Sequence, residues 1–506
     1  MTDFDGKYSI KVPKNSKLVF SYMGYATQII DVQGRTEIDV FMVSEASALD
    51  EIIIVGYGQQ KKESVVGSIV QVSGDDLLQS GGVSTVGQAL TGRLPGVTTI
   101  SSTGRPGDEN PSIFIRGQST WNGGGPLILV DGIERSMGDI NSSDVESISV
   151  LKDASATAVF AVKGANGVIL ITTKRGKVGD AKLSVTLGST LKTPSKYDSY
   201  NGIAVTNEAI ERVLPLNEEG WRQYTPVDIL DRYRNPRNET DRYVYPNVDW
   251  VDYTQNDFAM DYRANLSVSG GTDVVKYFGA VTYQHVGDIF NGSSFENGRN
   301  YTPSFNYDRF NFRSNVDFDI TKTTRLSVNL SGYYGVQNGN NAENELLYSS
   351  IYNLAPSLFY PIYPDGTFGR TVVENYELAN PAVILSTKGS TKNHRVQVNT
   401  DFILNQKLDF ITEGLSFRGT LSYDNNFRGE GGINDPDPTG GDNVIYKIYL
   451  SDGTEQIVVP PGTNQFDYVV QPWTRDALQI QDWQTERRLF YLLLLTTKKQ
   501  LQTSII

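Results

Sequence analysis

The feature that most constrains this chain is a set of long segments beyond residue 177 in which apolar and polar residues alternate. Alternation places successive side chains on opposite faces of a β-strand, so each segment is expected to have one apolar and one polar face. The pattern recurs, and we count about eight candidate strands by this test. The clearest segments are 262–269, 310–320, 325–335, 395–404 and 415–424.

The connections between these strands separate two fold classes. A β-sandwich surrounded by water also alternates, so the period by itself leaves that alternative open. A tight turn at 319–325 joins two of the strands at one end, whereas a long irregular stretch, roughly 336–392, follows at the other. Short turns at one end and long loops at the other are typical of outer-membrane barrels. We therefore predict that residues 177–506 form the first strands of an incomplete transmembrane β-barrel.

No segment is apolar enough to cross a membrane as a helix. The strongest apolar run, 489–495, is much shorter than the run of about 18 residues that such a helix requires. The last residues, 492–506, drop the alternation of the preceding segments. Met1 is followed by neither a basic start nor an apolar stretch, so the chain is expected to lack a signal peptide.

The composition argues against several classes of function. A net charge of −13 is unfavourable for binding nucleic acid, because phosphate contacts require clustered Lys and Arg. The two histidines, His285 and His394, lie in separate strands without a surrounding motif, and there is no cysteine. No HExxH or GxSxG motif occurs. We therefore expect no catalytic activity, no cofactor and no structural metal site.

The region before residue 177 divides into three units. Residues 1–43 hold short strands punctuated by glycine and asparagine, as in a small β-sandwich. Residues 44–62 form a linker that contains one strongly β-prone run. Residues 63–176 combine a helix-like segment at 84–96 with apolar strands and an alanine-rich helix-like segment at 154–162, which predicts a compact α+β domain.

Several stretches of this region together resemble one known family. The run DVESISVLKDASATAVFAVKGANGVILITTKRGK, residues 144–177, closely resembles the plug signature of SusC/RagA-type TonB-dependent outer-membrane transporters. LDEIIIVGYGQQKKESVVGSI, GRLPGV, IFIRGQST and PLILVDGI are similar to the same family in the same order. Residues 1–43 resemble the carboxypeptidase-regulatory-like β-sandwich that precedes the plug in these proteins. The expected fold is mainly β, with an α+β plug between a truncated sandwich and the barrel strands.

The resemblance implies a nutrient importer in the outer membrane of a Gram-negative bacterium. In this family the plug sits inside a barrel of about 22 strands, which faces outer-membrane lipid. TonB and its inner-membrane complex supply energy, and a SusD-like lipoprotein covers the outer opening. The imported ligand is an oligosaccharide or a peptide, with carbohydrate uptake the better expectation. With about eight strands, the chain is expected to be an N-terminal fragment of such an importer; the alternative is a non-transporting remnant that folds only its plug and N-terminal module.

The resemblance also assigns a partner-binding strand to the linker. An extended strand offers main-chain hydrogen bonds to the edge of another protein's sheet, so this run is expected to bind TonB. An ordinary strand of the plug or the sandwich is the alternative. The residues of the run are Asp50, Glu51, Ile52, Ile53, Ile54 and Val55.

Two strand ends in the plug carry charged residues followed by glycine. Arg116, before Gly117, is expected either to pair with a carboxylate of the barrel wall, where it would take part in gating, or to form a salt bridge within the plug. Asp131, before Gly132, is predicted to form a turn rather than a binding carboxylate.

Three other segments have local signals. Left-handed backbone angles are expected in the GANG motif at Gly164, Asn166 and Gly167. The segment 434–443 has the acidic offsets of a calcium loop, but Tyr446 stands where such a loop has glutamate, so a loop without metal is predicted. The aromatic-rich segment 348–369 is expected either to stack on sugar rings or to pack within the loops.

Overall fold

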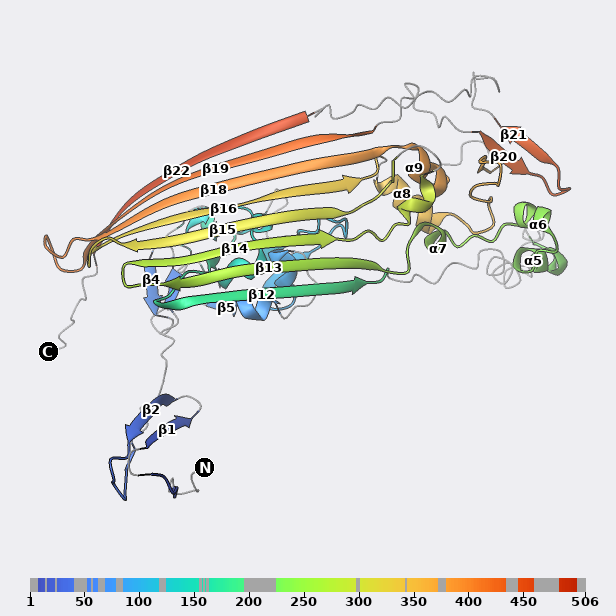
Figure 1. Cartoon of the computed structure of the whole chain (residues 1–506). Helices are drawn as coiled ribbons and strands as arrows, with labels where there is room; N and C mark the ends of the chain where they lie inside the picture. The colour runs from blue at the N-terminus through green and yellow to red at the C-terminus, as the bar shows by residue number, and fades with distance from the viewer. Residues whose placement is uncertain are drawn as a thin grey trace.

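The computed structural model shows a long curved sheet with a smaller α+β domain against one of its faces (Figure 1). No helix within the described residues is long and apolar enough to cross a membrane. The structure describes residues 8–13, 16–22, 25–40, 52–55, 58–61, 69–78, 85–117, 124–153, 157, 160, 163–194, 224–296, 301–341, 344–371, 379–433, 445–458 and 482–497.

The large sheet has eight antiparallel strands, each hydrogen-bonded to the next along the chain. This confirms the strand count predicted from alternation. The strands are β12 (Gly179–Lys192), β13 (Ala259–Gly271), β14 (Val275–Val286), β15 (Tyr307–Asp319), β16 (Thr324–Gly339), β18 (Ser390–Lys407), β19 (Leu415–Ile433) and β22 (Asp482–Thr497).

The last strand corrects one prediction. The sequence stretch from residue 492 was expected to leave the alternating pattern, yet residues 492–497 complete β22 and pair with the start of β19. Leu489, Tyr491, Leu493 and Leu495 are exposed, whereas Phe490, Leu492 and Leu494 are less so. The burial of the side chains therefore still alternates along this strand. The sequence does not show the alternation, because the more exposed and the less exposed residues are both apolar.

The two faces of the sheet differ in the way that the barrel prediction requires. On β15 the buried positions are polar or charged, including Asn311, Arg313 and Asn315, whereas Phe310 and Phe318 are exposed. The same division holds on β16, where Ser327 and Asn329 are buried and Leu330 is exposed. A β-sandwich surrounded by water would show the opposite arrangement, with its apolar face inside. A polar interior and an apolar exterior are typical of outer-membrane barrels.

The domain from residue 69 to residue 173 forms the plug. Its sheet has the strand order β5–β10–β11–β8–β9, in which β8 and β11 are parallel and the other pairs antiparallel. Short helices α1 (Gly74–Leu78) and α2 (Val86–Ala89) pack on a core that includes Leu77, Val86, Ile148 and Ile171. The strands are β5 (Ile69–Ser73), β8 (Leu127–Val130), β9 (Ile133–Glu134), β10 (Val145–Leu151) and β11 (Val168–Thr173), with β6 (Val97–Ile100) and β7 (Ser112–Ile115) forming a separate pair.

The helix predicted at 84–96 is shorter than expected. Thr85 caps α2 through a reciprocal pair of hydrogen bonds with Gln88, which fixes where the helix starts. The helix ends after a single turn, and Gly92 and Gly96 then adopt positive φ angles of 72° and 83°. These glycines turn the chain toward β6. The predicted helix at 154–162 lies mostly outside the described residues.

The long loops at one end of the sheet pack into one folded unit, which we call the loop module (Figure 1). Its hydrophobic core combines Trp250, Phe290, Leu385 and Tyr446, one residue from each of four loops. The predicted irregular stretch is thus partly regular. The elements of the loop module are α5 (Val227–Arg234), α6 (Glu239–Val244), α7 (Trp250–Thr254), η7 (Gly292–Phe295), α8 (Asn344–Asn353), β17 (Phe368–Gly369), α9 (Pro381–Thr387), β20 (Tyr446–Tyr449) and β21 (Glu455–Val458).

The aromatic-rich segment contributes to this packing. Phe359 and Phe368 are buried in the core of the loop module. Tyr363 is also buried, and its ring contacts Tyr243 and Tyr449. For these side chains the structure supports packing within the loops. The segment 434–443, which was considered as a calcium loop, lies outside the described residues.

Asp288 makes the stability of the loop module depend on pH. Burial raises the pKa of its carboxyl to about 6, although it accepts backbone hydrogen bonds from Phe305 and Phe290. The folded module therefore binds a proton between about pH 4 and pH 6 that the unfolded chain does not bind, so stability is expected to rise by about 2 to 3 kcal/mol as the pH falls from 7 to 4. Urea unfolding followed by Trp250 fluorescence measures this slope.

The control for this prediction is Asp288→Asn, which cannot titrate and keeps one acceptor oxygen. The variant is expected to show a flatter dependence on pH over the same range. If the parent and the variant have the same slope, Asp288 is not the titrating group.

Candidate functional site: the polar seam between plug and sheet

The plug is bonded to the inner face of the sheet through polar side chains, which we call the polar seam. Its centre is Arg135, which directly follows β9. The side chain of Arg135 extends from the plug to the sheet. The guanidinium donates to Asp401 Oδ2 on β18 at 3.1 Å and to Asp424 Oδ2 on β19 at 3.0 Å. It also donates to Ser422 Oγ at 3.0 Å. One plug side chain therefore joins two neighbouring strands of the wall.

The Arg135 cluster is almost dry. The side chains of Arg135 and Asp401 are 4 % and 3 % exposed, and that of Asp424 is 14 % exposed. Burial alone lowers the pKa of Arg135, but the hydrogen bonds to Asp401 and Asp424 outweigh it and raise that pKa above its usual value. Arg135 is therefore permanently charged, and its loss would leave two buried carboxylates without their cation.

Other ion pairs cross the polar seam. Arg175, at the end of the plug, donates to Asp317 on β15 at 2.7 Å and to Asn329 on β16 at 3.0 Å. In the reverse direction, Arg313 on β15 donates to Asp144 Oδ2 of the plug at 3.2 Å. Burial raises the pKa of Asp144 even with Arg313 beside it.

Further hydrogen bonds extend the seam along β13, β15, β16 and β18. Arg263 donates to Ser142 Oγ and Ser143 Oγ at 2.9 and 2.8 Å. Asn315 donates to Thr173 Oγ1 at 3.0 Å and to the carbonyl of Lys174 at 2.7 Å. Near the loop module, Gln337 donates to Asp108 Oδ2 at 2.9 Å, and Arg395 donates to Asp108 Oδ1 at 3.0 Å. These contacts bind the plug at both ends.

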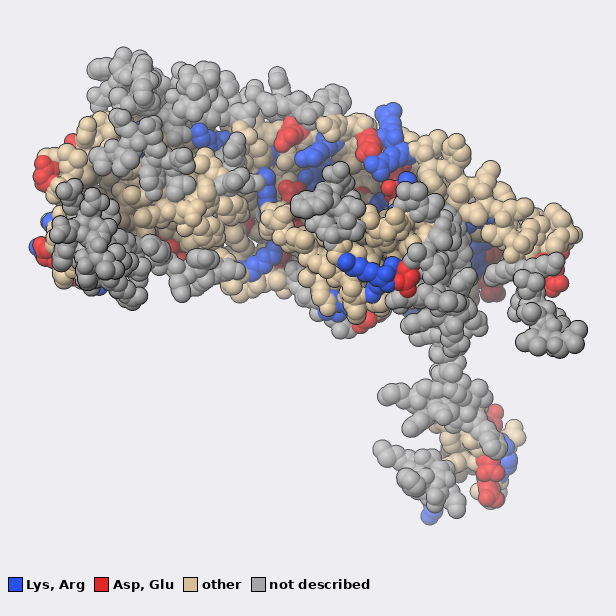
Figure 2. Space-filling view, turned by 180° about the vertical axis from the view of Figure 1, so that it is seen from behind, with Lys and Arg blue, Asp and Glu red and all other residues tan. Residues whose placement is uncertain are grey.

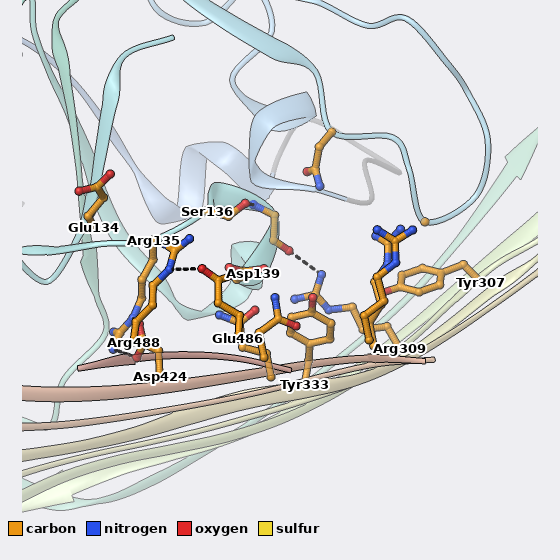
Figure 3. Close-up of a pocket in the computed structure, with 17 residues that line it drawn as sticks. Glu134, Arg135, Ser136, Asp139, Tyr307, Arg309, Tyr333, Asp424, Glu486 and Arg488 are labelled. Carbon is orange, nitrogen blue, oxygen red and sulfur yellow. Dashed lines mark hydrogen bonds and ion pairs between the residues drawn. The ribbon is translucent and has the colours of Figure 1, made fainter. Parts of the chain in front are cut away.

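A cavity of about 340 Å³ lies within the seam beside Arg135 (Figure 3). Arg309, Tyr307 and Tyr333 point into it from the sheet, and Ser136 and Asp139 face it from the plug. Seen from behind, side chains of both charge signs lie close together over the middle of the molecule (Figure 2). No group of three or more potential metal ligands occurs among the described residues.

The plug residues that were predicted from the sequence lie outside the polar seam. Arg116 bonds to Asp153 inside the plug, as in the second of the two alternatives, and its side chain is 60 % exposed. The backbone at Arg116 and Gly117 is left-handed, with φ of 60° and 90°. This corner follows the end of β7.

Asp131 and Gly132 form the turn between β8 and β9. Their φ angles are 50° and 92°, and the Asp131 carboxylate accepts hydrogen bonds from Thr173 N at 3.1 Å and Thr173 Oγ1 at 2.7 Å. The turn is therefore fixed to the end of β11. Since Arg135 follows three residues later, this turn positions the centre of the polar seam.

The prediction for the GANG motif is correct only for Gly167, whose φ is 91°. Gly164 and Asn166 do not have positive φ, so the expectation of left-handed angles at these two positions is wrong. Gly164 is required for space, because a Cβ there would lie 3.0 Å from both the Thr157 carbonyl oxygen and the Phe160 side chain. The close approach of this turn to the preceding segment explains the glycine.

The predicted TonB-binding run contains a strand. Ile52–Val55 form β3, which pairs in antiparallel register with β4 (Gly58–Lys61) as a two-stranded sheet. Asp50 and Glu51 lie outside the described residues. The seam residues themselves, Arg135, Arg175, Asp401 and Asp424, were not singled out in the sequence. The available signal was the presence of charged residues at the inward positions of alternating strands, as at Asp317 and Asp401.

Comparison with known proteins decides what this arrangement is. Residues 61–168 match the family described as TonB-dependent Receptor Plug Domain. SusC of Bacteroides thetaiotaomicron, a TonB-dependent receptor, is 31 % identical over 335 residues, which cover 63 % of this chain and 31 % of SusC. The chain belongs to the SusC/RagA-type family of TonB-dependent receptors.

One other relative supports this assignment, and a solved structure shares the fold. A TonB-dependent receptor of Formosa agariphila is 34 % identical over 364 residues, 70 % of this receptor and 34 % of the relative. The RagAB peptide importer in its open-open state shares the fold, with a TM-score of 0.57 at 20 % identity over 76 % of this receptor and 43 % of that chain. This receptor spans about a third of the length of the curated relatives that it matches.

Proposed function

We propose that this receptor takes part in TonB-dependent import across the outer membrane of a Gram-negative bacterium, with the plug as its gate. The observation that carries the proposal is the polar seam, in which Arg135 joins the plug to two strands of the wall. Ion pairs can hold a domain in one position and still exchange their partners for water when the domain moves. A plug held by apolar packing would separate less readily from the sheet in a water-filled channel.

The strand β3 is the proposed handle for TonB. Strands of four residues in a two-stranded sheet have little stability of their own. An incoming strand can therefore pair with the free edge of β3, or replace β4, through main-chain hydrogen bonds. In this proposal Asp50 and Glu51 flank the contact, and Ile52, Ile53, Ile54 and Val55 form it.

The remaining plug residues have a supporting role in this proposal. Tight backbone corners occur at Arg116–Gly117 and at Asp131–Gly132. The GANG motif packs closely against the segment before it. We therefore propose that the plug moves as a rigid domain. The loop module, built from four loops, offers a surface for a SusD-like lipoprotein. An oligosaccharide or a peptide is the proposed cargo, and a neighbour of the same fold is described as a peptide importer.

Deleting residues 50–56 in the native host tests the proposal. Uptake of a radiolabelled oligosaccharide or peptide that parent cells import is expected to stop, while binding of the same ligand to the cell surface stays. The matched control deletes residues 409–413, which lie in the turn between β18 and β19. Uptake at the parental rate without residues 50–56 would contradict the assignment of β3.

A further inference from the structure

The cavity in the polar seam is lined by more arginines than carboxylates. Five arginines line it, and every one of its carboxylates except that of Asp139 has a cation of its own. Asp424 is bonded to Arg135, Glu486 to Arg488, and Glu134 to Lys163. The five arginines are Arg135, Arg309, Arg395, Arg428 and Arg488.

Two of these arginines have no carboxylate partner among the described residues. Arg428 lies exposed at the rim of the cavity. Arg309 lies on the floor and is 9 % exposed. Its Nε donates to Asn311 and its Nη1 to the carbonyl of Gly138, both at 2.7 Å, but its buried Nη2 has no partner. A buried guanidinium N–H without an acceptor is unfavourable, so this atom is arranged for an acceptor that enters from the cavity.

Asp139 is the remaining carboxylate, and its electrostatic repulsion of an anionic ligand is weaker than a full negative charge would give. It lies on the plug side of the cavity, and burial raises the pKa of its carboxyl. The neutral form is thereby favoured beside an incoming negative group. The other titratable or charged groups of this part of the floor are Arg135, Arg309, Asp424, Tyr307 and Tyr333, and Asp424 is already bonded to Arg135. The cation left for an acid on the ligand is that of Arg309.

The other lining groups match a sugar. Tyr333 lies under the Arg309 guanidinium at 3.9 Å, and Tyr307 lies next to it on the floor. Three amides, Asn110, Gln397 and Asn426, line the remaining wall, and Gln397 Oε1 is buried without a partner. Amides and tyrosines bind hydroxyl groups and ring faces, and a cavity of this volume is at the small end of ligand sites. It has room for one unit of a longer chain.

We propose that this cavity binds a uronic acid unit of an acidic oligosaccharide, with its carboxylate on Arg309, while Arg428 at the rim attracts the carboxylate of a neighbouring unit. The inference rests on the proposed import function and names the substrate class that the seam accepts. The seam then does two things. It holds the plug, and it offers the passing ligand an N–H of Arg309, at Nη2, that has no acceptor within the described protein.

Calorimetry on the full chain in detergent tests this with trigalacturonate, maltotriose and a tri-aspartate peptide as probes. Trigalacturonate is expected to bind, with maltotriose and tri-aspartate at least tenfold weaker, because only the first combines a carboxylate with sugar hydroxyls. Arg309→Gln is expected to weaken trigalacturonate binding about tenfold or more, since a charge-assisted hydrogen bond is lost. Arg234→Gln, on the exposed side of α5, is the matched control and should bind as the parent does.

A second variant protects the test against misfolding. Arg428→Gln lies on the exposed rim, makes no ion pair in the described chain and should also weaken trigalacturonate binding severalfold. Absence of trigalacturonate binding to the parent, or equal binding of maltotriose or tri-aspartate, would overturn the proposal, as would unchanged binding in both variants. Binding in detergent needs no TonB, so this outcome is separate from the uptake test on residues 50–56.

Discussion

Replacing Arg135 by methionine is expected to destabilise the seated plug by about 3 to 5 kcal/mol, the usual cost of removing one member of a buried ion pair. Asp401 and Asp424 would remain in a nearly dry environment without a cation. The loss is measured as the free energy of opening of the backbone amides of β8, from native-state hydrogen exchange in detergent. We expect the exchange of this strand, which adjoins β9 and Arg135, to accelerate by at least a hundredfold.

Arg116→Met is the matched control, because it removes an arginine of the same domain from an exposed pair. Arg116 and Asp153 are 60 % and 31 % exposed, so its effect should stay below about 1 kcal/mol. Adding Asp401→Asn and Asp424→Asn to Arg135→Met should recover part of the loss, since no buried charge is then left. Equal effects of the two single substitutions would show that the seam does not hold the plug.

Gly74→Ala is expected to cost about 3 kcal/mol in plug stability, at the upper end for overpacking. A Cβ at this first residue of α1 would lie 1.9 Å from the carbonyl oxygen of Val145 on β10. That oxygen belongs to the backbone and cannot rotate away, so α1 must separate from the sheet of the plug. A lower urea midpoint for protease resistance of the plug is the expected observation.

Gly104→Ala provides the comparison, because a Cβ there meets no atom within 4 Å. Its urea midpoint should equal that of the parent. If both substitutions lower the midpoint by the same amount, the close approach of Gly74 to β10 is not the cause.

The eight-stranded sheet could be predicted because its signal is local. Alternation along β13, β15 and β16 fixes which side chains face the plug, and neighbouring strands are consecutive in the chain. The signal failed at β22, where Leu492 to Leu495 are apolar on both faces. An edge strand with apolar residues on both sides gives no period to detect.

The loop module and the seam could not be predicted, because their contacts join distant parts of the chain. Trp250 and Tyr446 share one core although each lies in a different loop. Arg135 and Asp424 are 289 positions apart. The sequence shows that Asp424 lies on a strand, but only the curvature of the sheet around the plug brings it to Arg135. Local rules predicted the turns of the plug at Asp131 and Gly167. They were wrong at Gly164, where glycine is needed because a side chain would collide with neighbouring atoms.

The central claim is that the plug closes the passage while it is bonded to the sheet and must separate from it for import. The most direct test is uptake by cells that carry Thr173→Cys with Asn315→Cys, joined by a short bifunctional reagent that forms a disulfide with each thiol. The parent has no cysteine, and these side chains are in hydrogen-bond contact at 3.0 Å across the seam. Thr173→Cys with Ser314→Cys, on the opposite face of β15, is the control and should not be joined. We predict that the cross-link stops uptake and that reductant restores it; uptake at the parental rate with the cross-link formed would contradict the account.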